Sequence, residues 1–186
     1  MSLTTDRIVS SSAMLVGFSS LVIALYQTHL MRESARASVL PYLMIAINSD
    51  SDGAYMTLRN AGLGPAVIND VVVSHQGRAI KGDAFDYYLT VRPGAKSDHA
   101  LSVDKIMPGR LIPAGEGIRM IGMGGGERER MLSDLLHLFE LAEVPQSWLE
   151  NAKATEPDKA VLEISYSSVY GDHWIARSNA IVPKGF

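Results

Sequence analysis

A run of glycines lies where a phosphate-binding loop would be expected. Gly122-Met123-Gly124-Gly125-Gly126 stands between an expected strand and an expected helix, and the free amides of a helix N-terminus attract anions. The dinucleotide-binding pattern needs glycine at its last position, where this chain has Glu127 and hence a negative charge. The nucleoside-triphosphate loop needs Gly-Lys-Ser/Thr, which is absent. We interpret the segment as a flexible connector and keep an anion site as the alternative.

Acidic residues around position 50 match the opening of a calcium loop. Asn48, Asp50, Asp52 and Gly53 occupy positions one, three, five and six of that pattern. The twelfth position must supply a bidentate carboxylate, and here it is Arg59. The segment also lies between expected strands and not between helices. It therefore predicts a polar hairpin turn, with a weak surface cation site as the alternative.

The residue types that bind metals or attack substrates are not suitably spaced. The chain has five histidines and no cysteine, and no two histidines have the spacing of a metal-binding pair on a helix or a strand. No Gly-x-Ser-x-Gly elbow is present. Carboxylates that are distant in the chain could still pair. We predict no catalytic, cofactor-binding or metal-binding residue.

Aromatic residues are the remaining candidates for a functional surface, because large aromatics are enriched at protein interfaces. Such a surface would use Tyr88, Trp148, Tyr170 and Trp174. The alternative is that these side chains complete the core of a small domain.

The element that places all of these residues is the N-terminal segment. Ile8 to Met31 contains no charged side chain, and as a helix it would reach ~36 Å against a hydrocarbon core of ~30 Å. We therefore predict a membrane anchor over residues 1–31, formed by one transmembrane helix. A buried core helix and a cleaved signal peptide are the alternatives. Arg32 and Arg36 follow the span and Arg7 precedes it, which slightly favours a cytoplasmic C-terminal domain.

Residues 32–40 are expected to form a juxtamembrane linker, and residues 41–186 one soluble domain of ordinary size. Apolar alternation predicts strands whose buried faces carry Leu43/Ile45/Ile47, Val67/Val71/Val73 and Leu162/Ile164/Tyr166. Helical spacing predicts one amphipathic helix over residues 127–142. The expected class is mainly β (α+β), an antiparallel β-sandwich with a helical insertion. A net charge of −3 without any basic run argues against a nucleic-acid partner.

Three stretches carry a resemblance to a known group. These are Arg36-Ala37-Ser38-Val39-Leu40-Pro41-Tyr42, Leu58-Arg59-Asn60-Ala61-Gly62-Leu63-Gly64-Pro65-Ala66 and Tyr166-Ser167-Ser168-Val169-Tyr170-Gly171-Asp172. They resemble uncharacterised bacterial proteins in which one N-terminal membrane helix carries a small β-rich domain with an N-x-G-x-G-P-A turn. The resemblance implies a bacterial inner-membrane location and this fold. It implies no activity.

Two functions fit these expectations. The first is a membrane-anchored, non-catalytic interaction or accessory subunit that docks on another protein, on a membrane complex or on a second copy of itself. The second is a membrane-localised module that binds a small ligand, or an enzyme of unknown reaction. Its pocket would lie between the sandwich and the 127–142 helix and be lined by Tyr88, Trp148 or Trp174.

Overall fold

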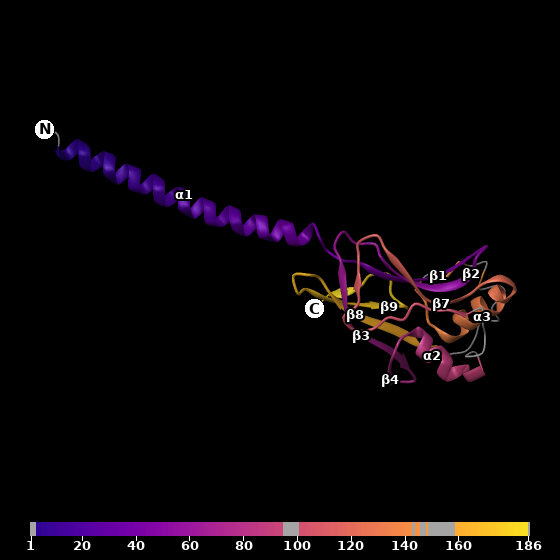
Figure 1. Cartoon of the computed structure of the whole chain (residues 1–186). Helices are drawn as coiled ribbons and strands as arrows, with labels where there is room; N and C mark the ends of the chain where they lie inside the picture. The colour runs from indigo at the N-terminus through magenta and orange to yellow at the C-terminus, as the bar shows by residue number, and fades with distance from the viewer. Residues whose placement is uncertain (1–2, 95–100, 143, 146–147, 149–158, 186) are drawn as a thin grey trace. The chain divides into compact units, whose positions relative to one another are not determined.

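The chain has two compact units, residues 1–38 and 39–186. The computed structural model describes residues 3–94, 101–142, 144–145, 148 and 159–185 (Figure 1). The first unit is helix α1, Leu3–Ala37, and the second is a domain built from antiparallel sheets with two short helices. The class is therefore α+β, as predicted.

Helix α1 is longer than the predicted anchor. It extends through Ala37, so residues 32–37 of the expected linker are helical. It is the one helix in the described part of the chain that is long and apolar enough to cross a membrane, and none of its apolar stretch is buried. Several hydroxyls of this stretch donate to carbonyl oxygens of the preceding turn. Examples are Ser11 to Arg7, Ser20 to Val16 and Thr28 to Ala24, each at 2.8 Å.

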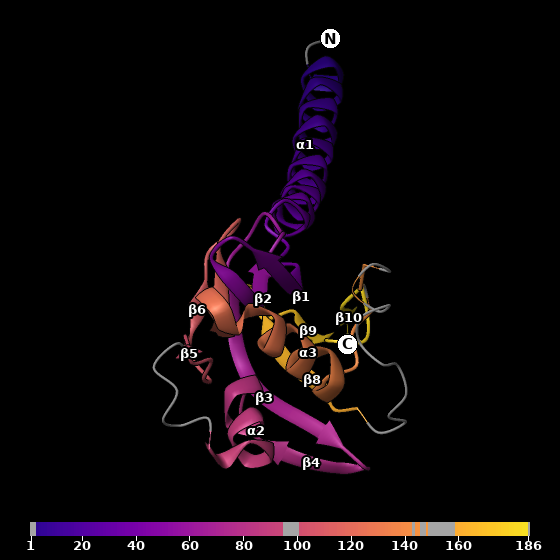
Figure 2. The ribbon, with the colours of Figure 1, turned by 90° about the vertical axis from the view of Figure 1, so that its right-hand side faces the viewer.

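The strands of the second unit form two sheets (Figure 2). The first sheet has the order β1-β2-β7-β5, and the second β10-β9-β8-β3-β4 with β6 on β3. All of the pairings between these strands are antiparallel. The strand bounds are β1 Leu43–Asp50, β2 Gly53–Asn60, β3 Ala66–His75, β4 Arg78–Lys81, β5 Leu101–Ser102, β6 Leu111–Ile112, β7 Gly117–Met123, β8 Val161–Ser167, β9 His173–Arg177 and β10 Lys184–Gly185.

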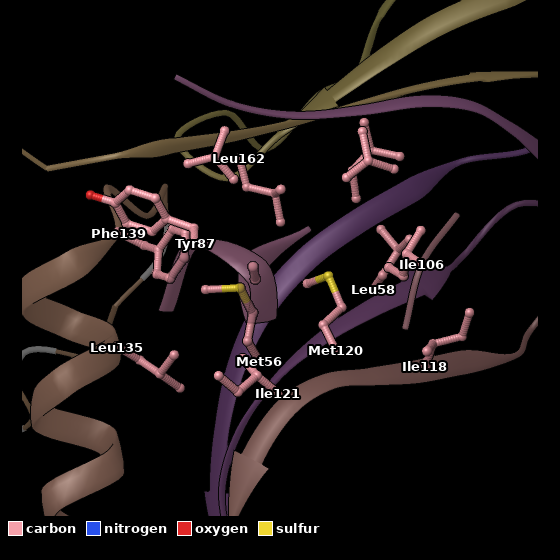
Figure 3. Close-up of a cluster of buried hydrophobic side chains, with 14 of the residues drawn as sticks. Met56, Leu58, Tyr87, Ile106, Ile118, Met120, Ile121, Leu135, Phe139 and Leu162 are labelled. Atoms are coloured by element: carbon pink, nitrogen blue, oxygen red, sulfur yellow. The ribbon is translucent and has the colours of Figure 1, made fainter. Parts of the chain in front are cut away.

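Side chains from both sheets and both short helices meet in one core (Figure 3). Strand β8 buries the predicted set, Leu162, Ile164 and Tyr166. Strand β3 differs from the prediction because Val67 is only half-buried and Ile68 is buried. The register of β3 against β8 shifts between Ile68 and Asp70. Such a bulge reverses the alternation on one side of it, so the simple period of Val67/Val71/Val73 fails at its first member.

The helices of the domain are α2, Ala84–Val91, and α3, Arg128–Leu138. Helix α3 ends four residues before the predicted end at position 142. Phe139 is extended and forms a parallel bridge with Ala160. The Glu140 amide donates to Ala160 O and the Ala160 amide donates to Leu138 O. Pairing with the segment before β8 replaces the last helical turn that local periodicity favoured.

Candidate functional site

One face of α3 lines a groove in the described part of the domain. Its volume is about 610 Å³. Its walls combine charged, hydroxyl and apolar side chains: Ser49, Arg128, Glu129, Leu132, Ser133, Leu136 and Trp148. Of the four aromatics predicted to form a surface, Trp148 lines this groove. The groove lies along the predicted helix, as the ligand-binding alternative required, but it is lined by neither Tyr88 nor Trp174.

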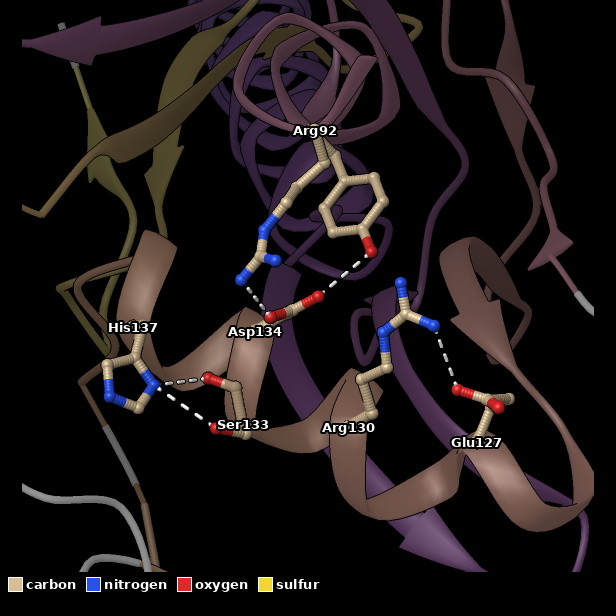
Figure 4. A network of polar contacts seen from close by, with 7 residues as sticks. Arg92, Glu127, Arg130, Ser133, Asp134 and His137 are labelled. Atoms are coloured by element: carbon tan, nitrogen blue, oxygen red, sulfur yellow. Dashed lines mark hydrogen bonds and ion pairs between the residues drawn. The ribbon is translucent and has the colours of Figure 1, made fainter. Parts of the chain in front are cut away.

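The opposite face of α3 carries a buried carboxylate with two partners (Figure 4). Asp134 is nearly buried. Its Oδ2 accepts from the Tyr88 hydroxyl at 3.0 Å, and its Oδ1 accepts from Arg92 Nη2 at 2.6 Å. Burial, and then the nearby Asp134 charge, raise the pKa of Tyr88 to about 12. The hydroxyl therefore remains protonated as a donor at neutral pH. The cluster joins α2 and the residue after it to α3.

Two further side-chain contacts involve residues of the same helix. Arg130 Nη1 donates to Glu127 Oε2 at 3.1 Å. A ring nitrogen of His137 lies 2.6 Å from the carbonyl oxygen of Ser133. No group of three or more potential metal ligands occurs in the part of the chain that is described. Because both oxygens of Asp134 are bonded, this cluster is suited to positioning helices.

The four predicted surface aromatics are not gathered in one place. Tyr88 is fully buried and packs in the core next to α3. Trp174 stacks on Tyr166 with ring centroids 5.7 Å apart, and β10 covers it through pairing with Gly185. Tyr170 is exposed in the turn between β8 and β9. The structure thus divides these residues between the surroundings of α3 and the second sheet.

The sequence analysis missed a side-chain knot at Asn60, the last residue of β2. Asn60 is fully buried. Its Oδ1 accepts from the amides of Tyr42 at 3.1 Å and Gly62 at 3.0 Å. Its Nδ2 donates to Gly64 O at 2.8 Å and to Ile112 O at 3.0 Å. All four hydrogen-bonding positions of this amide are used. One side chain therefore joins the residue before β1, the end of β2, the following turn and β6.

The glycines of this turn allow the chain around residue 40 to approach closely. A Cβ on Gly62 would lie 2.4 Å from Leu40 O, and one on Gly64 would lie 1.8 Å from Val39 O. The amides of Leu63 and Gly64 both donate to Leu40 O. The segment from Val39 to Tyr42 is therefore part of the domain. The last two residues of the predicted linker, 39 and 40, belong to the domain and not to a linker. The signal in the sequence was an asparagine two residues before the first of two spaced glycines, Gly62 and Gly64.

The two motifs considered for ligands form a strand-to-helix connection and a hairpin turn. In the first, Gly122 and Met123 belong to β7, and Gly125–Glu127 forms a 3₁₀ turn before α3. In the second, Asp50 Oδ2 accepts from Tyr55 Oη at 2.5 Å and Oδ1 accepts from the Asp52 amide at 2.8 Å. The hydrogen bond from Tyr55 holds the pKa of Asp50 below its usual value. This is the geometry of the polar hairpin turn.

Compared with protein-family models, with curated proteins and with solved structures, the chain matches none. The group resemblance therefore stays a prediction.

Proposed function

We propose that this protein is a single-pass, membrane-anchored accessory subunit whose soluble domain docks on another protein. The observation that carries the proposal is α1, an apolar helix with no buried residue in its apolar stretch, joined to a domain that has its own core. An isolated apolar helix in water would expose a large hydrophobic surface. A bilayer removes that surface from water. A cleaved signal sequence is the alternative, and an experiment must distinguish it from a membrane anchor that is retained.

The hydroxyl contacts within α1 favour the bilayer as its solvent. Serine and threonine are costly in hydrocarbon when their donors are unpaired. In α1 the Ser11, Ser12, Ser20 and Thr28 hydroxyls donate to their own helix. The segment is therefore more compatible with lipid than its serine content implies.

The domain supports an interaction role. Both sheets contribute to a single core, which supports a sandwich of two sheets as its architecture. The groove on α3 combines Trp148 and leucines with Arg128 and Glu129, the mixture of aromatic, aliphatic and charged groups found at protein interfaces. We propose a bacterial inner membrane as the location, with the domain on the cytoplasmic side, because Arg32 and Arg36 follow the span.

A small-ligand module is the second candidate, and the groove is the observation that favours it. At about 610 Å³ it has the volume of a ligand site. Its described polar groups come mainly from the exposed face of α3, so we rank this function below protein docking.

Mild-detergent purification of the full chain from its native membranes tests the docking function. We expect a stoichiometric partner or a defined oligomer. The Arg128→Glu variant should weaken that association, because Arg128 lines the groove. The matched variant Arg78→Glu, in the exposed β4, should leave it unchanged. A monomer without a partner would contradict the proposal. Equal effects of both variants would show that the groove is not the docking surface.

A further inference from the structure

The two ends of the domain differ in polarity. At one end are the connection to α1, the turn after β2, strand β6 and the turn after β8, and we call this the proximal end. Its exposed large apolar residues are Leu40, Leu63, Leu111, Val169 and Tyr170. At the other end, the β1–β2 turn consists of Ser51 and Asp52, and the β3–β4 turn of Gln76 and Gly77.

Strand register shows that the proximal residues lie close together. Val67 is paired with Leu111 on one side and with Ser167 on the other, and neighbouring strands are ~4.8 Å apart. Val169 follows Ser167 by two residues. The Leu63 amide donates to Leu40 O, and the Asn60 side chain joins that turn to Ile112 next to Leu111. These pairings and hydrogen bonds place the segments that carry the exposed apolar residues at the same end of the domain.

The chain between the apolar stretch of α1 and this end of the domain is short. The last residue of the apolar stretch of α1 is Met31, and residues 32–37 continue the helix, which adds ~9 Å of rise. Only Ser38 separates α1 from Val39, where the domain begins. The headgroup region of one leaflet is ~5–8 Å thick. Leu40, which bonds directly to the Leu63 turn, is thus tethered within reach of the interface.

We propose that the proximal end inserts Leu63, Leu111 and Val169 into the lipid interface, as a second membrane contact beside α1. This inference rests on the proposed anchoring by α1. Exposed apolar surface of this kind marks a membrane or protein interaction site, and Tyr170 is of the aromatic type enriched at bilayer interfaces. The charged residues at this end are of both signs: Glu116 and Arg59 are exposed, and Asp172 is half-buried. We therefore expect an apolar contact that does not depend on attraction to anionic lipids.

Single labels on the full chain test the contact, since the protein has no cysteine of its own. Leu63→Cys, Val169→Cys and the control Ser51→Cys would each carry an environment-sensitive fluorophore, in phosphatidylcholine vesicles with or without spin-labelled lipid. Ser51 lies beyond the eight-residue β1, ~25 Å from the proximal end. We expect blue-shifted emission and quenching by spin-labelled lipid at positions 63 and 169, and neither at position 51.

One further variant and one further lipid mixture distinguish the possible outcomes of this experiment. Leu63→Asp should reduce lipid quenching of the label at position 169, with a shift of ~10-fold or more in the ratio of inserted to free domain. Adding phosphatidylglycerol should leave the signal unchanged. Vesicle flotation without quenching at positions 63 and 169 would overturn this inference alone, and so would quenching that requires the anionic lipid. A protein that does not float with the vesicles would overturn the anchoring proposal itself.

Discussion

Replacing Asn60 by alanine tests whether one side chain holds the proximal end of the domain together. The substitution removes four hydrogen bonds, to Tyr42 N, Gly62 N, Gly64 O and Ile112 O. A buried donor or acceptor that loses its partner costs ~1–3 kcal/mol. Two of the four bonds are fully buried and two are partly buried, so we use the lower part of this range. The expected loss in the free energy of unfolding is about 4 kcal/mol.

Asn48→Ala is the matched control. Asn48 makes one partly buried side-chain bond, from Nδ2 to Thr57 Oγ1 at 2.9 Å. Its removal should cost ~0.5–1.5 kcal/mol. Both variants thus truncate an asparagine in the β1–β2 hairpin. Asn60→Ala removes four hydrogen bonds, and Asn48→Ala removes one.

Urea unfolding of residues 39–186, followed by circular dichroism, provides the measurement. With a slope of ~2 kcal/mol/M, Asn60→Ala should lower the midpoint by ~2 M while leaving the slope unchanged. Asn48→Ala should lower it by less than ~1 M. Equal midpoints for the two variants would refute the role assigned to the Asn60 knot.

Further predictions concern the turn after β2, the ion pair between Arg92 and Asp134, and two tyrosines. Gly64→Ala should abolish folding or cost several times more in midpoint than Gly126→Ala, because a Cβ at Gly64 would lie 1.8 Å from Val39 O and one at Gly126 meets nothing within 4 Å; similar midpoints would contradict this packing. Arg92→Met should destabilise the domain by ~1.5–3 kcal/mol, because it leaves a buried oxygen of Asp134 without the bond from the half-exposed Arg92, and Tyr88→Phe should cost a similar amount; an unchanged unfolding midpoint for either variant would contradict the role assigned to that bond. Burial raises the pKa of Tyr88 and of Tyr166 to about 12, above a usual value of ~10. Each therefore contributes up to ~2.7 kcal/mol below pH ~10, which is lost as pH rises towards ~12. Phenolate absorbance should show two tyrosines that titrate last, together with unfolding, and ordinary titration of both while the protein stays folded would contradict the burial assigned to them.

Much of the local structure was predictable because the apolar residues of each segment recur with the spacing of a strand or a helix. The alternation of Leu162, Ile164 and Tyr166 predicted β8, and the uncharged run from Ile8 predicted a long helix. These patterns depend on neighbours in the sequence, which one chain displays directly. The candidate groove was also placed beside the predicted helix, although with a different lining.

The failures arose where distant residues decide the structure. The end of α3 depends on Phe139 pairing with Ala160, and the burial of Ile68 depends on a bulge against β8. Neither contact has a local signature. The Asn60 knot needs acceptors as far away as Ile112, so the N-x-G-x-G-P-A turn was recognised while the hydrogen bonds of its asparagine were not. Tyr88 was a candidate both for a surface and for the core, and the sequence could not decide between them because it does not reveal that Asp134 pairs with Tyr88.

Membrane extraction of the full chain tests the central claim most directly. After washing at alkaline pH with carbonate, the intact protein should remain in the membrane pellet and be released by detergent alone. Residues 39–186 should be soluble without detergent. Val16→Arg, near the middle of the apolar stretch, costs ~2.5–3.5 kcal/mol on insertion scales, so the inserted fraction should fall by roughly a hundredfold relative to the soluble one. Full-length protein in the carbonate supernatant, or a mature chain that has lost α1 by cleavage, would contradict the account.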